Sequence, residues 1–164
     1  MTNRILFLAI ALFCFSCKNE PGASSSQAAP AAQPQGEMLP SLPTEKLQYL
    51  WENCDYVDYI FYNLPISMSL NEKSSIQYAL RHIAADPARI DPNCKPIGRI
   101  FYQVKGENVL EADIYFQQGC TYFKFLENNK PAYANYMTDE GIRYLNENIS
   151  RGTQMKNQVQ QGGQ

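Results

Sequence analysis

The 164-residue sequence contains few of the residues that usually mark a catalytic or nucleic-acid-binding protein. It has one histidine and one tryptophan, and its 14 basic and 16 acidic residues form no run of one sign. Nothing in it would attract a nucleic-acid backbone, so we expect no nucleic-acid partner. Gly106, Gly119, Gly141 and Gly152 stand singly, without the spacing of a phosphate-binding loop, and we expect no cofactor.

One unbroken apolar run, Ile5–Phe15, follows Arg4 and precedes Ser16 and Cys17. The run is too short to remain in a membrane as a spanning helix. A basic start, an apolar stretch and a small residue at its end are the three regions of a secretory signal. Residues 1–16 are therefore predicted to be a signal peptide that is removed.

A cysteine placed directly after Ser16 at the end of such a run resembles the lipobox of bacterial lipoproteins. The resemblance implies that Cys17 is fatty-acylated, with palmitate or a similar chain, and becomes the mature N-terminus. Cys14 fits less well, because the bulky Phe13 precedes it. Lys18 stands where an Asp would favour retention in the inner membrane, which implies the outer membrane, either periplasm-facing or surface-exposed. The overall plan is similar to small uncharacterised Bacteroidota lipoproteins.

The segment after Cys17 is rich in Ala, Pro, Gln, Ser and Gly and has almost no large apolar residue. Such a composition buries too little surface to fold, so residues 17–43 are predicted to be a lipidated cysteine and a flexible linker. As a flexible coil the linker would reach about 30 Å. Residues 44–152 are then expected to form a single domain, and the Gln- and Gly-rich residues 153–164 a disordered tail.

The region 97–137 is typical of four strands joined by hairpin turns. Its aromatic and β-branched runs are separated by short polar or glycine-containing connectors. The predicted strands are Ile97–Val104, Val109–Gln117, Cys120–Glu127 and Pro131–Met137. Apolar and polar residues alternate most clearly in the second of these, which indicates a sheet with one face on a core and one toward water.

Three helices are predicted around these strands. Apolar residues spaced by three and four from Leu47 to Phe61 predict a first helix, with Thr44 as its N-cap and Leu64-Pro65 as its end. A similar spacing predicts a second helix from Ile76 toward Ala84, with Ser69 and Glu72 forming a capping box. A third short helix is expected to start at Asp139 and to end near Gly152. The order favours an α+β fold, in which a four-stranded antiparallel meander is covered by two N-terminal helices and one short C-terminal helix.

The cysteines that would remain after lipidation are Cys54, Cys94 and Cys120. Pairing is expected in an oxidising compartment, but one cysteine must be left over. Cys94 and Cys120 would lie at the same end of the meander, so we favour a disulfide between them and a buried, unreactive Cys54. Pairing of Cys54 with either of the other two is the alternative.

A nucleophilic Cys54 could in principle use His82 as its base, with Asp55 or Asp58 as the orienting group. Cys54 lies in register with apolar residues, however, and cysteines in that position pack more often than they react. We interpret His82 as a surface or boundary residue. Since it is the only histidine and the cysteines lack a close pair, no metal site is expected.

Glu111 and Asp113 would project from one strand face about 7 Å apart, with Glu107 just before them. Two carboxylates at such a distance could bind calcium or act on a glycosidic bond. On the solvated face of a sheet they are also the ordinary polar half of the alternation, which we favour.

The sequence as a whole predicts a membrane-tethered envelope lipoprotein that is not an enzyme and that serves as a binding or interaction module. An envelope protein or a glycan is the expected partner, which Tyr56, Tyr59, Tyr115 and Tyr122 could contact if they are exposed. For each of these tyrosines taken alone, partial burial is the favoured interpretation. The alternatives are an envelope hydrolase that uses the acidic strand face or Cys54 with His82, and an inhibitor of a secreted enzyme.

Overall fold

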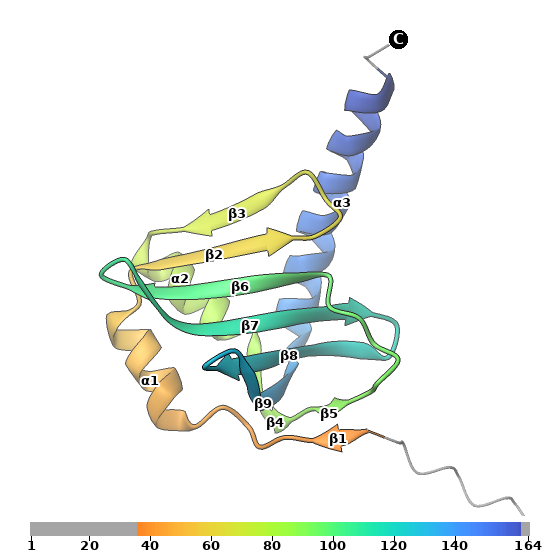
Figure 1. The fold of residues 1–164 in the computed structure, drawn as a ribbon. Helices are drawn as coiled ribbons and strands as arrows, with labels where there is room; N and C mark the ends of the chain where they lie inside the picture. The colour runs from red at the N-terminus through yellow and green to blue at the C-terminus, as the bar shows by residue number, and fades with distance from the viewer. Residues whose placement is uncertain (1–35, 162–164) are drawn as a thin grey trace, which may run out of the picture. The chain divides into compact units, whose positions relative to one another are not determined.

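The computed structural model describes residues 36–161, with three helices and nine strands in that part of the chain (Figure 1). The elements are β1 (Glu37–Met38), α1 (Thr44–Asn53), β2 (Tyr56–Phe61), β3 (Ser67–Leu70), α2 (Lys73–Leu80), β4 (Ile83–Pro87), β5 (Arg89–Ile90), β6 (Gly98–Val104), β7 (Glu107–Gln117), β8 (Cys120–Glu127), β9 (Lys130–Met137) and α3 (Asp139–Gln161). The predicted signal peptide, the lipidation site Cys17 and the linker up to residue 35 lie outside the described residues.

Seven strands form one antiparallel sheet in the order β3-β2-β6-β7-β8-β9-β4, and β1 pairs with β5 in a separate two-stranded ribbon. The four predicted strands are present as β6 to β9, joined by consecutive hairpins. The predicted fold class was nevertheless wrong. The protein is mostly β, and its sheet is not a four-stranded meander covered by two N-terminal helices.

The largest error concerns the segment 54–61, which was assigned to the first helix. Helix α1 ends at Asn53, and Tyr56–Phe61 forms β2 at the interior of the sheet. Val57, Tyr59 and Phe61 are buried on one face, so the period is two rather than 3.6. All six residues of β2 pair with β6, a partner about forty residues away that a local pattern cannot reveal.

The second predicted helix is shorter than expected, and its predicted cap is absent. Helix α2 ends at Leu80, and Ile83–Pro87 forms the edge strand β4 beside β9. Ser69 lies in β3, where its hydroxyl donates to Asp58 Oδ1 at 2.8 Å instead of capping a helix. A Ser-x-x-Glu pattern therefore occurs here at the end of a strand.

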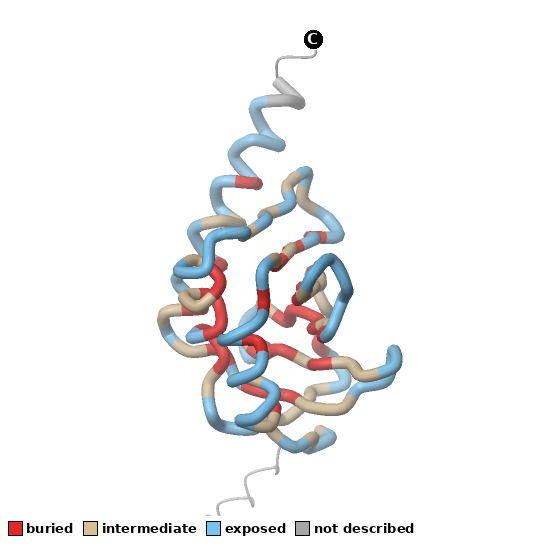
Figure 2. The backbone as a smooth tube through the Cα atoms, turned by 90° about the vertical axis from the view of Figure 1, so that its left-hand side faces the viewer, coloured by how far each residue is buried: buried red, intermediate tan, exposed pale blue. Residues whose placement is uncertain are grey.

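Helix α3 does not end at Gly152. It runs to Gln161, and Gly152 is buried within it. A Cβ added at Gly152 would lie 2.5 Å from Ile66 Cδ1, which is too close. The glycine thus permits a close approach between α3 and the β2–β3 connection. The side chains of 153–158 are exposed, and Figure 2 shows the last described turns of α3 in pale blue.

The main core lies between one face of the sheet, here called the inner face, and the three helices. Helices α2 and α3 lie behind the sheet in Figure 1. The buried residues of this core come from every layer: Leu50, Cys54, Val57, Tyr59, Phe61, Ile76, Leu80, Ile100, Tyr102, Ala112, Ile114, Phe123, Phe125, Met137 and Leu145, among others. Within residues 36–161, no helix packs on the opposite face of the sheet, the outer face.

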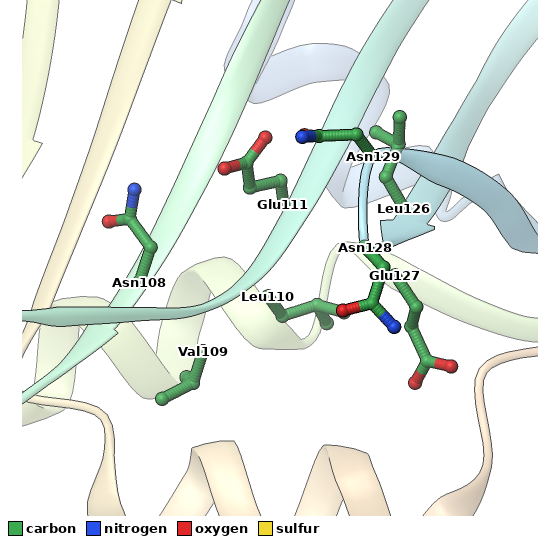
Figure 3. Close-up of a pocket in the computed structure, with 8 residues that line it drawn as sticks. All are labelled: Asn108, Val109, Leu110, Glu111, Leu126, Glu127, Asn128 and Asn129. Atoms are coloured by element: carbon green, nitrogen blue, oxygen red, sulfur yellow. The ribbon is translucent and has the colours of Figure 1, made fainter.

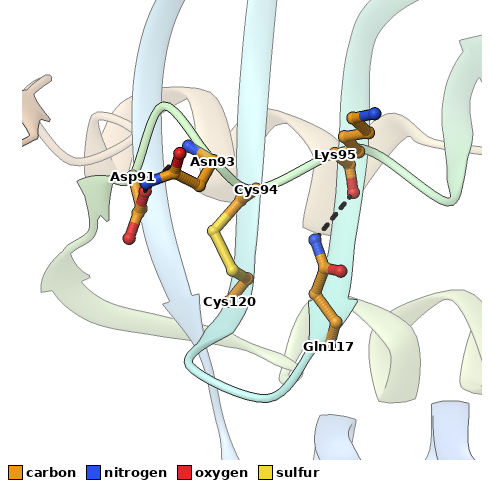
Figure 4. Close-up of a disulfide and its surroundings, with 6 residues drawn as sticks. All are labelled: Asp91, Asn93, Cys94, Lys95, Gln117 and Cys120. Atoms are coloured by element: carbon orange, nitrogen blue, oxygen red, sulfur yellow. Dashed lines mark hydrogen bonds between the residues drawn. A yellow bond between two sulfur atoms is a disulfide. The ribbon is translucent and has the colours of Figure 1, made fainter.

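The outer face is covered at one end, here called the disulfide end, by β5 and the loop that follows it. Cys94 in that loop is disulfide-bonded to Cys120 at the start of β8, with Cα atoms 6.0 Å apart (Figure 4). The predicted pairing is thus confirmed, and Cys54 is buried and unpaired. A second apolar cluster, which includes Ala88, Tyr115 and Tyr122, packs beneath this loop.

Among residues 36–161, no helix has both the length and the apolar character that crossing a bilayer requires.

Candidate functional site

The predicted carboxylate pair is present on the outer face, but both of its members are neutralised. Arg99 Nη1 lies 3.0 Å from Glu111 Oε2, and Arg99 Nη2 lies 2.8 Å from Asp113 Oδ1. Lys124 Nζ lies 3.6 Å from the other oxygen of Asp113 and donates to the Tyr115 hydroxyl at 2.6 Å. Burial alone lowers the pKa of Arg99, but the hydrogen bond that Arg99 donates to Asp113, together with the negative charge of Asp113, outweighs burial and raises this pKa. The four charges form a structural ion network.

The carboxylates do not form a metal site with further acidic residues. Glu107 lies away from Glu111 and lines a separate hollow with Tyr49, Asn53 and Lys105. Within the described part of the chain, no group of three His, Cys, Asp or Glu side chains is arranged to hold a metal ion.

The sequence-predicted catalytic groups are dispersed. Cys54 is buried, its thiol donates to the Tyr56 carbonyl at 3.3 Å, and burial raises its pKa. Asp55 accepts a hydrogen bond from the Lys105 amide, and Asp58 accepts one from Ser69. Each of these groups is engaged in holding the fold.

His82 was interpreted as a surface or boundary residue, and this was wrong. Its side chain is 1% exposed and lies between the rings of Tyr78 and Tyr144, with both ring centroids 4.8 Å away. Its Nε2 has no hydrogen-bond partner among the described residues, and burial lowers its pKa. Its neighbours are not those of Cys54, so the structure gives no Cys-His pair.

Most of the tyrosines expected to face a partner are buried. Tyr59 lies in the main core, whereas Tyr115 and Tyr122 stack beneath the disulfide loop with centroids 4.4 Å apart. Burial raises the pKa of Tyr122 to about 12. Of the four, Tyr56 alone is partly exposed.

A hollow lies at the other end of the sheet, here called the hairpin end. This hairpin-end pocket has a volume of about 460 Å³ and is lined by the start of β7 and the β8–β9 turn (Figure 3). Its lining residues are Asn108, Val109, Leu110, Glu111, Leu126, Glu127, Asn128 and Asn129. Its volume lies within the usual range of ligand pockets, about 300–1,000 Å³.

Two β-bulges shape the hairpin-end pocket. Tyr102 pairs with Leu110 and Gln103 with Asn108, so Val109 is an extra residue in β7. In β9, Ala132 is extra in the same way, between the partners of Phe125 and Leu126. A bulge re-aims the neighbouring side chains. In Figure 3, Glu111 and Asn129 point toward each other across the pocket and Val109 points to the opposite side.

The β8–β9 turn is held in one conformation by its backbone. Asn128 and Asn129 have φ of 51° and 62°, as the two central residues of a type I′ turn require. Asn tolerates this left-handed region better than most residues. The turn therefore presents two adjacent amide side chains in a defined position beside β7.

The amides of the hairpin-end pocket have no partner in the protein. Within the described residues, the side chains of Asn108, Asn128 and Asn129 make no hydrogen bond, whereas both carboxylates of the pocket are paired. Glu127 lies 2.7 Å from Lys46 Nζ and accepts from the Tyr133 hydroxyl at 3.2 Å. The hydrogen bond with Lys46 lowers the pKa of Glu127, which therefore stays ionised.

The sequence reasoning missed these asparagines, because it interpreted them as turn residues and nothing more. The pairs Asn128-Asn129 and Lys105-Gly106 are typical of turns, and this is why hairpins were predicted there. What brings the amides together is the bulge at Val109, which has no local signature that we recognised.

No family model, curated protein or solved structure matches this chain. The chemistry of the pocket and the N-terminal sequence features are therefore the two indications of function.

Proposed function

We propose that the protein is a non-enzymatic binding module of the bacterial cell envelope, tethered to the outer membrane by a lipid on Cys17, and that the hairpin-end pocket is its binding site. The observation that carries this proposal is the set of three asparagine amides without protein partners around a hollow of about 460 Å³. Asn108, Asn128 and Asn129 are exposed, so water satisfies their amides in the free protein, and the polar groups of a bound ligand would replace that water.

The ion pairing of the acidic groups supports binding over hydrolysis. A general acid or nucleophile needs a carboxyl group that is free to exchange a proton or attack. Asp113 is nearly buried and is held by Arg99, and Lys124 stands beside it. Glu111 shares the same guanidinium.

Binding can be tested with the full-length protein in liposomes. We expect envelope components to co-sediment with liposomes that carry the wild-type protein. With the Asn108→Ala variant this co-sedimentation should be lost. Asn63→Ala is a matched control, because Asn63 is an exposed amide at the opposite end of the sheet. Equal binding by the two variants would exclude the pocket as the site.

The hydrolase alternative has its own test. If Cys54→Ala, His82→Gln, Glu111→Gln or Asp113→Asn abolished a measured turnover while the fold survived, the proposal of a non-enzymatic module would fail. The anchor is tested separately by mass spectrometry of the mature protein, in which an intact leader or an unmodified thiol at Cys17 would exclude lipid tethering.

A further inference from the structure

The charges around the hairpin-end pocket already balance. Its two carboxylates, Glu111 and Glu127, are each paired with a cation, Arg99 at 3.0 Å and Lys46 at 2.7 Å. An anionic ligand would approach two carboxylates, and a cationic ligand would have to compete with the two resident cations. The pocket therefore offers no net charge with which to select an ion.

The groups that are left for a ligand are neutral and can both donate and accept. Each asparagine amide has two N–H donors and one acceptor oxygen. Gln103 pairs across the strands with Asn108, and its amide likewise has no partner within the described residues. Four such amides at one corner of the sheet match a ligand whose own groups are donors and acceptors at once, as the neighbouring hydroxyls of a sugar are.

Two partly exposed aromatic rings lie on the outer face beside residues of the pocket, and together they are here called the aromatic strip. Beside Asn108 and Gln103, the next cross-strand residue is Tyr56. Beside Glu111, the next is Phe101. Both rings are partly exposed. Aromatic rings offer a large apolar surface at a small cost in side-chain entropy, and the C–H faces of sugar rings can pack on such a surface.

The length of the strip favours a chain over a single small molecule. Neighbouring strands lie about 4.8 Å apart, so the distance from β8 to β2 across β7 and β6 is about 14 Å. A single sugar would occupy the pocket and leave the rings of Phe101 and Tyr56 unused. A short oligosaccharide would contact both the amides and the rings.

We infer that the ligand of the hairpin-end pocket is a neutral, polyhydroxylated carbohydrate chain, which lies across the strands from the amides of Asn108 and Asn129 toward the rings of Phe101 and Tyr56. This inference rests on the proposed function. A peptide is the less favourable occupant. Strand addition needs an open sheet edge and helix binding needs an apolar groove. At the pocket, β7 and β8 are paired on both sides, and most of the lining residues are polar.

The experiment uses the full-length protein in detergent micelles and, as probes, soluble oligosaccharides of glucose, mannose, xylose and N-acetylglucosamine. Binding is followed by calorimetry and by the NMR signals of the asparagine side-chain amides. We expect at least one neutral oligosaccharide to bind and to shift the amide signals of Asn108 and Asn129. Loss of one amide should weaken the affinity about tenfold, the usual effect of one or two lost hydrogen bonds.

The variants are chosen so that the turn survives. Asn129→Gly removes the amide and still accepts a positive φ, whereas Asn108→Ala acts on an extended strand. Phe101→Ala should weaken the binding of an oligosaccharide more than the binding of the corresponding monosaccharide. Asn63→Ala should change nothing. Because the wild-type amide signals are a direct readout, a variant that failed to fold would not remove the test.

Three outcomes would overturn the inference. If only acidic polysaccharides or peptides bound, in a manner sensitive to Asn108→Ala, the ligand class would be wrong while the binding function stood. If neutral oligosaccharides bound equally to wild type and to both pocket variants, the site would be wrong. If no neutral, charged or peptidic probe shifted the asparagine signals, the inference and the proposed function would both fall.

Discussion

The disulfide end and the hairpin end of the outer face belong to the same strands, β7 and β8. The polar and aromatic side chains are buried at the first end and exposed at the second. At the disulfide end, Tyr115 and Tyr122 are stacked and buried beneath a loop that Cys94 attaches to Cys120. At the hairpin end, the amides of the pocket are open and unpaired. A covering segment stabilises one end, whereas at the other end the amides are exposed, and we propose that they bind a ligand.

The ion network of Arg99, Asp113 and Lys124 lies between the two ends. The disulfide loop does not extend over this network. Its most buried charge, that of Asp113, is neutralised by Arg99 and Lys124. Stability should therefore depend on the disulfide end and the network, and binding on the hairpin end.

Removal of the disulfide should have the largest effect on stability. Cys94→Ala with Cys120→Ala opens a covalent loop with a sequence separation of 26 residues, and the loop-entropy model then predicts a loss of about 3 to 4 kcal/mol. Denaturant unfolding of the two proteins measures this loss. A reductant should destabilise the wild type and leave the double variant unchanged. If ligand affinity at the hairpin end fell together with stability, the two ends would not be independent.

Disruption of the ion network should have the next largest effect. Arg99→Met removes the principal partner of Asp113, whose side chain is 8% exposed, so we expect a loss of about 2 kcal/mol in the free energy of unfolding. The double variant with Asp113→Asn should recover part of this loss, because no buried charge is then left unpaired. Glu111→Gln, at a more exposed pair, should cost less than about 1 kcal/mol. Equal losses for Arg99→Met and Glu111→Gln would contradict the assignment of Asp113 as the buried member.

Acidification should destabilise the protein through His82 on the inner face and leave the hairpin end unaffected. Burial lowers the pKa of His82 in the folded protein. When the pH falls below about 6.5, the ordinary pKa of histidine, His82 is therefore protonated in the unfolded chain but stays neutral in the folded one. The stabilising contribution is complete above that pH and is lost as the pH falls toward the lowered pKa. Its slope is at most about 1.4 kcal/mol per pH unit.

The charges that face this histidine are those of Arg81 and Glu140, which form an ion pair at 3.8 Å. Unfolding measured between neutral and mildly acidic pH should show a smaller loss for His82→Phe than for the wild type. Identical pH profiles would exclude His82 as the cause. Affinity at the hairpin-end pocket should stay constant over the same range, since the lowered pKa of Glu127 keeps its carboxylate charged.

The pocket variants should have the smallest effect on stability. Asn108→Ala and Asn129→Gly remove amides that bond to nothing in the described chain, so the free energy of unfolding should change by no more than about 0.5 kcal/mol. Thermal unfolding measures this change. A large loss from either variant would mean that the hairpin end is built for stability, like the disulfide end.

The features that sequence reasoning recovered are those encoded by neighbouring residues. Strands β6 to β9 were found because each has an alternating or aromatic run and ends at a turn with Gly or Asn. The geometry of that meander favoured the pairing of Cys94 with Cys120 over a pairing of Cys54, and the structure has the favoured pair. Helix α1 was found as far as Asn53.

The features that it missed depend on partners distant in the chain. Residues 56–61 have apolar side chains that fit a helix as well as a strand, and their pairing with β6 decides between the two. His82 is buried because Tyr144 and Gly141 of α3 pack on it. The mutual neutralisation of Arg99, Glu111 and Asp113 required the register of β6 against β7.

The sequence by itself determined the hairpins and the position of the turn asparagines, because backbone preference and short-range alternation act within a few residues. It favoured the disulfide that the structure has but did not exclude a pairing of Cys54. The tertiary structure alone decided that the sheet has seven strands, that a bulge at Val109 brings the pocket amides together, and that the carboxylates nearby are neutralised. Each of these depends on which strands pair and in which register, and that choice is set by the burial of the whole inner face.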